Sequence, residues 1–328
     1  MKKLNVLFAA FAVFYMGTAA VAAPWKLATI RPEGSAIDVA VHKFVDDVKK
    51  GTDGRIDIQI YPNSVLGDYT TVQELVSLGS VEMQCGSMSW QVDKRLSAFI
   101  QPYLVKDWET AKKNYSKGAK FTAFCEEILE KQNVKVLAYW PIYFGGIALT
   151  KDVANPLDTE KKNLKVRVPS TKQWEALADA FGFQATPLPF SEFFTAAQTG
   201  MVEGIFGAGA ENHYVNFKDI MKAEIPINTH FECWPLIINK ELYDGLSDAD
   251  RATLDKAAAD FEAERWGAAP PETESYLKKL EEKGIKVYRP TPEQLEHFSE
   301  VGRKATFPVL EQICGKKGYE EILATIVD

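Results

Sequence analysis

The sequence lacks the short motifs by which most enzymes are recognised. It has only four histidines, and none of them shows the His-x-x-His or Glu-x-x-His spacing of a metal site. It also has no Gly-x-Ser-x-Gly elbow, no Walker phosphate loop and no dinucleotide-binding fingerprint. We therefore expect no catalytic residues, no cofactor and no metal. The competing hypothesis is a hydrolase or isomerase that uses Asp68, Glu33 or His213 as an acid or base.

Cysteine is scarce as well. The four cysteines, Cys85, Cys125, Cys233 and Cys314, stand far apart, which excludes a zinc knuckle and a redox Cys-x-x-Cys pair. An oxidising compartment permits disulfides, whereas buried free thiols fit the same spacing. The sequence leaves both states open.

Long apolar runs are missing except at the start of the chain. Lys2 and Lys3 precede an apolar stretch from about residue 4 to 16, and small residues follow as far as Ala23. This pattern is typical of a secretory signal peptide, and its apolar stretch is too short to span a bilayer comfortably. We expect cleavage after Ala22, because cleavage one residue later would leave Pro24 at the new N-terminus. The sequence thus predicts a periplasmic protein; an uncleaved membrane anchor is the alternative.

Basic residues are fewer than acidic ones. Removal of residues 1–22 takes two lysines from the 38 basic residues and none of the 45 acidic ones, so the mature chain carries a formal charge of −9. Such a chain offers no basic face for nucleic acid or anionic lipid. At roughly 300 residues it also exceeds one comfortable hydrophobic core, which favours two lobes.

The sequence does contain a clear alternation of strands and helices. Strands predicted at 164–169, 183–188 and 202–206 are separated by helices at 171–181 and 191–199. This order predicts an open α/β sheet, in which ligands bind at the carboxyl ends of strands. Arg167 lies near such an end, and its planar guanidinium can pair two-to-two with a carboxylate. Arg167 is therefore the predicted anchor of an organic acid; a solvated arginine on an edge strand is the alternative.

Further candidate contacts lie at other predicted strand ends and crossovers. Glu33 stands between a strand at 25–30 and a helix at 36–50, where it could instead complement the helix N-terminus. Ser87 follows a strand at 83–86. The remaining candidates are aromatic residues that fit either an aromatic-walled cleft or an ordinary core: Trp90, Trp140, Tyr143, Phe190, Phe206 and Trp234.

The mature chain resembles the solute-binding proteins of tripartite ATP-independent periplasmic (TRAP) transporters, a family with dicarboxylate-binding and sialic-acid-binding members. The resemblance extends from Trp25 to the final helix and depends on the order and spacing of several short segments. These are residues 54–62 (GRIDIQIYP), 66–68 (LGD), 78–83 (LGSVEM), 164–169 (LKVRVP), 187–192 (PLPFSE), 196–200 (AAQTG) and 229–230 (TH).

The resemblance implies a two-lobed periplasmic solute-binding fold, with a cleft between two α/β domains and a long helix in the C-terminal half that spans both. We expect crossovers between the lobes at 139–150, through Gly145-Gly146, and near 231–238. Lobe I is then 23–146 plus about 235–255, lobe II is 147–234 plus about 285–328, and residues 256–284 form the spanning helical segment. Pro270-Pro271 should break or kink this helix.

The resemblance also assigns roles. It implies that Arg167 is the principal ligand anchor and that Phe190 packs over the bound acid. Two positions depart from the family pattern: Ile147 stands where many members have a second basic residue, and residues 205–208, which include Phe206 and Gly207, replace a Gln-Glu-Asn-Pro segment. Asn212 is the candidate for the missing amide, with an ordinary helix cap as the alternative.

Loss of the second basic group weakens the case for a dicarboxylate, and an aromatic-lined pocket with one arginine favours a monocarboxylate with an apolar or aromatic tail. We therefore predict an extracytoplasmic receptor that delivers an organic acid to TRAP membrane permease subunits, and the resemblance implies a monomer. A receptor for a C4-dicarboxylate or a sugar acid, or one that serves a sensor or chemoreceptor, are the alternatives.

Overall fold

Two separate β-sheets divide the chain into two α/β lobes. The computed structural model describes residues 23–327, so the predicted signal peptide lies outside the described residues. The sheet of lobe I has the order β2-β1-β3-β10-β4, in which β1 pairs in parallel with β2 and β3, and β10 is antiparallel to β3 and β4. Its strands are β1 (Trp25–Thr29), β2 (Ile58–Tyr61), β3 (Met83–Cys85), β4 (Val134–Phe144) and β10 (Phe231–Asn239).

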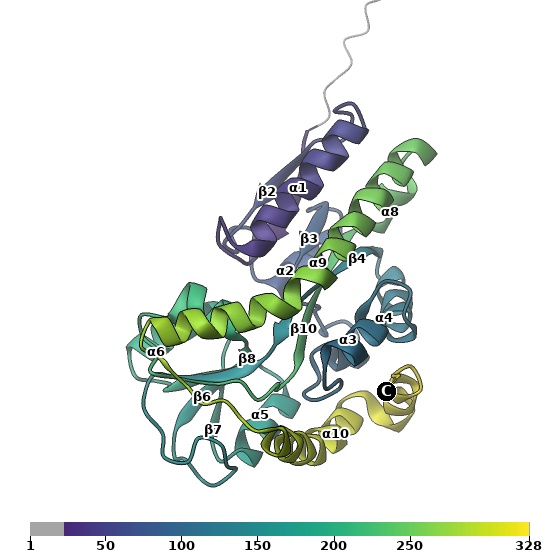
Figure 1. The fold of residues 1–328 in the computed structure, drawn as a ribbon. Coiled ribbons are helices and arrows are strands. Elements are labelled where there is room, and N and C mark those ends of the chain that lie inside the picture. Colours follow the sequence, from purple (N-terminus) through teal and green to yellow (C-terminus); the bar gives the residue numbers. More distant parts are fainter. Residues whose placement is uncertain (1–22, 328) are drawn as a thin grey trace, which may run out of the picture.

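Helices cover both faces of this sheet. On one face, α1 and the first half of α9 bury an apolar core that includes Phe44 and Phe261, and Figure 1 shows these two helices side by side. The helices of lobe I are α1 (Ala36–Gly51), α2 (Tyr69–Ser77), the 3-10 helix η1 (Lys94–Ile100), α3 (Trp108–Tyr115), α4 (Lys120–Glu130) and α8 (Lys240–Asp244). The left-handed backbone of Gly118 (φ 83°) separates α3 from α4.

The sheet of lobe II has the order β11-β9-β5-β8-β6-β7. Its strands are β5 (Gly146–Leu149), β6 (Lys165–Val168), β7 (Gln184–Pro187), β8 (Gly204–Ala208), β9 (Ala223–Ile225) and β11 (Lys286–Val287). The helices of this lobe are α5 (Lys172–Ala180), the 3-10 helix η2 (Phe190–Glu192), α6 (Phe193–Gln198), α7 (Ala210–Asn212) and the π-helix η3 (His213–Phe217). The parallel pairs of β6 with β7 and β8 confirm the α/β alternation expected from 164 to 206.

Two crossovers join the lobes. At the first, β4 passes through Gly145 into β5, and at the second the chain runs from β9 into β10. The crossovers are bonded to each other, since Gly145 N donates to His230 O at 2.8 Å and Thr229 N donates to Gly145 O at 2.9 Å. A side chain at Gly145 would overlap the ring of His230. Close packing therefore accounts for this glycine.

Helix α9 (Asp248–Glu282) spans both lobes. Its first half packs with Leu254 and Phe261 in the core of lobe I, whereas Leu277 and Leu280 pack in the core of lobe II. Pro270-Pro271 lies between these halves, and Figure 1 shows the helix changing direction between the lobes.

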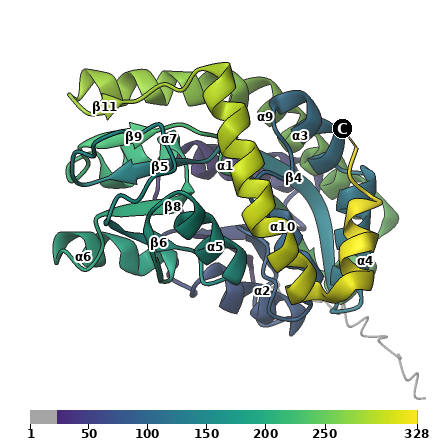
Figure 2. The ribbon, with the colours of Figure 1, turned by 90° about the horizontal axis from the view of Figure 1, so that it is seen from below.

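Helix α10 (Pro292–Leu323) also contacts both lobes. Phe298 packs in the core of lobe II, but Leu310 and Ile322 pack in the core of lobe I, and Figure 2 shows the helix running from α5 toward α4. Residues 285–328 were expected in lobe II as a whole, and the structure instead places the second half of α10 against lobe I. The helix bends at Gly315, whose φ of 74° and ψ of 158° are not helical.

All four cysteines are free. Cys85, Cys125 and Cys233 are buried, and Cys314 is partly exposed. Of the two states that the sequence left open, the structure shows the free thiols.

Candidate functional site

A small cavity lies where the two lobes and both crossovers meet. The space open to the centre of a water molecule is about 50 Å³. Lobe II contributes Arg167, Pro169, Trp174, Phe190 and Gly207 to its lining. Lobe I contributes Arg31, Tyr69, Ser87, Tyr143, Glu232 and Trp234, and His230 of the second crossover completes the polar lining. Since about 10–15 Å³ holds one water, the cavity as it stands accommodates only a small molecule.

Arg167 brings a positive charge into this cavity. Its side chain is buried on β6, where Nε donates to Leu188 O at 2.9 Å and Nη1 donates to Phe206 O at 3.3 Å. No carboxylate of residues 23–327 forms an ion pair with Arg167, and burial lowers the pKa of its guanidinium below the ordinary value of arginine. Within the described part of the protein, the Arg167 guanidinium thus has no carboxylate in direct contact, and Asp68 and Glu232 act on it only from a greater distance.

Gly207 leaves room beside this guanidinium. Its φ of 79° is in the left-handed region, and a side chain there would come within 2.7 Å of the Pro169 ring and 3.5 Å of Arg167 Nη1. Glycine is required at this position for both its backbone conformation and its lack of a side chain.

Arg31, in contrast, has partners within the protein. It follows β1, is buried, and its Nη2 donates to Tyr143 Oη at 3.3 Å and lies 3.7 Å from Glu211 Oε2 of lobe II. The amide of Asn212 faces the same guanidinium and accepts from Nη2 at 3.1 Å when its oxygen is on that side. Burial opposes the charge, but Glu211 and Tyr143 outweigh it and raise the pKa of Arg31. Arg31 thus forms a balanced pair across the lobes.

Glu232 is a buried carboxylate on the lobe I side. His230, Glu232 and Trp234 alternate along the chain, so their side chains point to the same face. Glu232 Oε2 lies 3.0 Å from His230 Nε2, and Oε1 accepts from Trp234 Nε1. On the other side of the His230 ring, Nδ1 is 3.1 Å from Thr229 Oγ1. The neutral tautomer of His230 with hydrogen on Nε2 satisfies all of these contacts.

The structure brings six of the predicted contacts together. All six line the cavity: Arg167, Phe190, Tyr143, Trp234, Ser87 and Gly207. A seventh, Asn212, is fully buried behind Arg31.

Four other predicted contacts lie elsewhere. Glu33 is exposed in a shallow hollow beside α1 and β2, because the loop after β1 turns Arg31 inward in its place. The ring of Phe206 packs against Phe183 in the core of lobe II, and only its carbonyl oxygen reaches Arg167. Trp90 does not line the cavity and has its ring 6.2 Å from that of Tyr69, which does.

Trp140 packs against helix α9 and does not line the cavity. The Trp140 ring packs against Phe261 of α9, with centroids 4.5 Å apart, and under the guanidinium of Arg265 at 4.9 Å. Arg265 in turn donates to the carbonyl oxygens of Pro141 at 2.7 Å and Ile142 at 3.2 Å. The tryptophan is therefore part of the attachment of α9 to β4.

Sequence reasoning missed Arg31 and Glu232 as site residues. Both carried a signal: Arg31 directly follows a strand end, and Glu232 is a charged residue inside an otherwise apolar strand. The three groups considered as acid or base are not brought together. Asp68 caps α2, Glu33 is exposed, and His213 is buried with Nδ1 2.7 Å from Glu224 Oε2.

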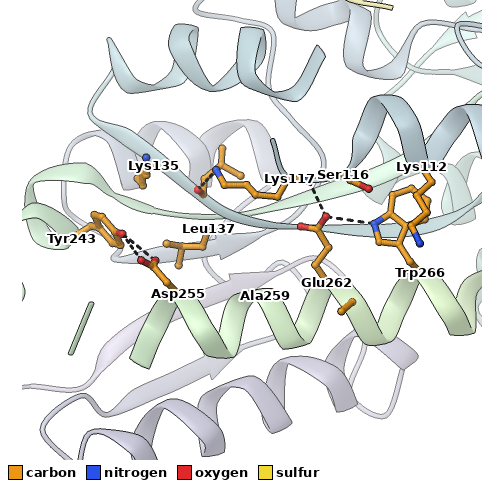
Figure 3. A pocket seen from close by; sticks show the side chains of 12 residues that line it. Lys112, Ser116, Lys117, Lys135, Leu137, Tyr243, Asp255, Ala259, Glu262 and Trp266 are labelled. Atoms are coloured by element: carbon orange, nitrogen blue, oxygen red, sulfur yellow. Dashed lines mark hydrogen bonds between the residues drawn. The ribbon is translucent and has the colours of Figure 1, made fainter. Parts of the chain in front are cut away.

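A larger hollow lies on lobe I, between α9, β4 and the end of α3 (Figure 3). It shares no residue with the interlobe cavity. Its charges are largely paired within the protein: Lys117 pairs with Glu126, Lys135 pairs with Glu130 at 2.8 Å, and Glu262 accepts from the backbone N–H of Lys117 at 2.8 Å. Arg167, which has no ion-pair partner among the described residues, therefore makes the interlobe cavity the better candidate site.

Comparison with known proteins agrees with this geometry. The family model of bacterial extracellular solute-binding protein, family 7, matches residues 27–311. The chain belongs to this family. Family 7 is one of solute-binding receptors of TRAP transporters, not of enzymes, and it is periplasmic. Within residues 23–327, no helix combines the length and apolarity needed to cross a bilayer.

Individual relatives cover most of the chain. The C4-dicarboxylate-binding periplasmic protein DctP of Rhodobacter capsulatus is 28% identical over 286 residues, which are 86% of this chain and 84% of that protein. The sugar-acid-binding protein DctPAm of Advenella mimigardefordensis, solved with galactonate, has a TM-score of 0.83 at 22% identity and covers 93% of this chain and 97% of its own. A TRAP protein of Ralstonia eutropha H16, solved with (S)-2-acetolactate, has a TM-score of 0.81 at 22% identity, with 92% and 98% covered. The predicted family and two-lobed α/β fold are confirmed.

Proposed function

We propose that this family 7 receptor binds an organic monocarboxylate through an ion pair with Arg167 and delivers it to the permease subunits of a TRAP transporter. The observation that supports this most directly is the buried charge of Arg167 without an ion-pair partner among the described residues. A ligand carboxylate would balance that charge and accept from the guanidinium, which is the geometry arginine favours.

The balance of charges favours one ligand carboxylate over two. Arg31 is already paired with Glu211, and the buried carboxylate of Glu232 faces the same cavity. A second ligand carboxylate would therefore meet a like charge in a buried site, where water screens charges weakly. Relatives are named for both classes, since one binds C4-dicarboxylates whereas others were solved with the monocarboxylates galactonate and acetolactate.

The aromatic walls favour an apolar portion on the ligand. Tyr69, Tyr143, Trp174, Phe190 and Trp234 line the cavity around the charged groups. A ligand that contacts both lobes also stabilises their closed arrangement, because it binds the closed state better than the open one. This closed state is the form that we expect the permease to recognise.

The test is thermal unfolding and calorimetric titration of the mature protein, unfolded and refolded beforehand to remove any copurified ligand. The panel contains matched mono- and dicarboxylates, hydroxy and keto acids, sugar acids and aromatic carboxylates. A ligand at about a hundred times its dissociation constant should raise the melting temperature by several degrees, since it adds roughly 2.7 kcal/mol. Arg167→Ala should weaken binding more than about a hundredfold, because loss of one partner of a buried ion pair costs about 3–5 kcal/mol.

Arg303→Ala is the matched control. Arg303 Nε also donates to a backbone carbonyl, Tyr103 O at 2.9 Å, but the residue lies on α10 outside the cavity. This variant should bind the same acid with unchanged affinity. An acid that binds Arg167→Ala as tightly as the wild type, or a clear preference for dicarboxylates, would contradict the proposal.

A further inference from the structure

Glu232 is a buried charged residue in an otherwise uncharged strand. It lies in β10, whose other residues from Phe231 to Ile238 are uncharged, and it is 7% exposed. Burial of a carboxylate is costly unless hydrogen bonds replace its water. His230 and Trp234 each supply one hydrogen bond from the same strand face. A structural role alone does not require this charge, because the strand would be complete with an apolar residue.

The carboxylate of Glu232 can accept further hydrogen bonds. Its two oxygens together have about four acceptor positions, and His230 and Trp234 use two of them. Glu232 lines the cavity and forms no ion pair with Arg31 or Arg167 within residues 23–327. A hydrogen-bond donor that enters the cavity can therefore reach an acceptor that the described residues do not saturate.

The cavity therefore has a positive end and a negative end. Arg31 is balanced by Glu211, which leaves the positive charge of Arg167 on the lobe II side and the negative charge of Glu232 on the lobe I side. Both ring nitrogens of His230 have partners, since Nδ1 lies 3.1 Å from Thr229 Oγ1 and Nε2 lies 3.0 Å from Glu232 Oε2. A complementary molecule presents a carboxylate at one end and a donor at the other.

We infer that Glu232 determines specificity by accepting a hydrogen bond from the ligand, so that the receptor selects monocarboxylates with a hydroxyl or ammonium group over the same acids without one. This inference rests on the proposed function, since it takes the carboxylate to be held by Arg167. An acid without the donor leaves the Glu232 oxygens desolvated and unpaired, and sites built to bond a donor reject such analogues strongly. The shared chemistry is the donor; its source, hydroxyl or ammonium, is for the experiment to decide.

The experiment titrates two matched series calorimetrically into the mature protein. One series is propanoate, lactate and alanine; the other is 3-phenylpropanoate, phenyllactate and phenylalanine. Within each series only the group on the second carbon changes, from hydrogen to hydroxyl to ammonium. In at least one series, we expect the wild type to bind one donor-bearing acid at least about tenfold more tightly than the plain acid. The tighter of the two identifies the donor.

Glu232→Gln separates recognition from structure. The substitution keeps the shape but replaces one acceptor oxygen by an amide that only donates. The preference for the donor-bearing acid should fall about tenfold, whereas the plain acid should bind as well as before or better. A merely structural role would weaken both acids equally. Glu262→Gln is the control, since Glu262 is a buried glutamate of α9 in the hollow of Figure 3, and its variant should keep the wild-type preference.

Three results would overturn the inference. Equal affinity of the wild type for plain and donor-bearing acids, with Arg167→Ala still abolishing binding, would remove the role of Glu232 and leave the proposed function intact. An unchanged preference in Glu232→Gln would do the same. Binding of no acid, or binding that survives Arg167→Ala, would overturn the proposed function and this inference together. If Glu232→Gln fails to fold, the ratios measured on the wild type decide the question.

Discussion

Arg31 and Arg167, one from each lobe, lie against the same aromatic ring: each guanidinium carbon is 5.7 Å from the ring centroid of Phe190. The negative face of an aromatic ring attracts cations, and the attraction is stronger in a site without water. Phe190 therefore helps two like charges to share one small cavity. It lies on η2 at the start of the helix pair that ends at Gln198.

Phe190→Leu should weaken ligand binding about tenfold, because it removes both cation–π contacts while it keeps an apolar side chain. The measurement is the dissociation constant of the best acid from the panel, with the melting temperature of the free protein as a check on folding. Phe194→Leu is the control. Phe194 is 40% exposed and stacks on Phe217, and neither arginine lies over its ring. Equal effects of the two substitutions would contradict the role given to Phe190.

The pair of Arg31 and Glu211 should show strong coupling in a double-mutant cycle. Arg31→Gln leaves Glu211 buried without its cation, which should lower the free energy of unfolding by about 3 kcal/mol. Glu211→Gln should then lower the free energy of unfolding much less in the Arg31→Gln protein than in the wild type. The coupling energy between the two substitutions should be at least about 1 kcal/mol. Urea unfolding of the four proteins measures this. Additive effects would mean that the 3.7 Å contact between lobes contributes no energy.

Gly145→Ala should damage both stability and ligand binding. The added methyl group would overlap the His230 ring and come within 2.6 Å of Thr229 Oγ1, so the crossover must shift. Such overpacking costs about 1–3 kcal/mol, and displacement of His230 disturbs its contact with Glu232.

Gly267→Ala, the same substitution at another position, should change the stability in the opposite direction. Gly267 is an exposed position of α9 with no atom within 4 Å of the added methyl group, so the substitution should stabilise the protein by up to about 1 kcal/mol and leave binding unchanged. Denaturant unfolding and titration of both variants check the pair. A Gly145→Ala protein with wild-type stability and affinity would show that the crossover tolerates a side chain.

Structural features that depend on the local sequence pattern could be predicted from the sequence. The apolar strand around Arg167 and the helix predicted at 171–181 are local features, and the structure shows them as β6 and α5. The long resemblance supplied the two-lobed arrangement, which local pattern alone does not specify.

Features that depend on tertiary contacts were not predictable in this way. Whether Arg31 or Glu33 points into the cleft depends on the turn of one loop, and both residues suit the site chemically. Trp140 and Tyr143 were both candidates for the cleft, but Trp140 packs against Phe261 of α9, a tertiary contact that no local pattern indicates. Glu232 escaped notice because it lies in a stretch that was considered only as a crossover. The second half of α10 likewise packs on a lobe that its position in the chain does not indicate.

The two charged ends of the cavity belong to different lobes. Arg167 is fixed in the sheet of lobe II, whereas Glu232 is fixed in the sheet of lobe I, just past the crossover. On the proposed binding mode, a molecule that engages both residues ties the lobes together, and a molecule that engages one does not. A partial mimic, such as an acid without the donor, would then occupy the open receptor without closing it. Such a molecule would be an inhibitor of uptake and never its cargo.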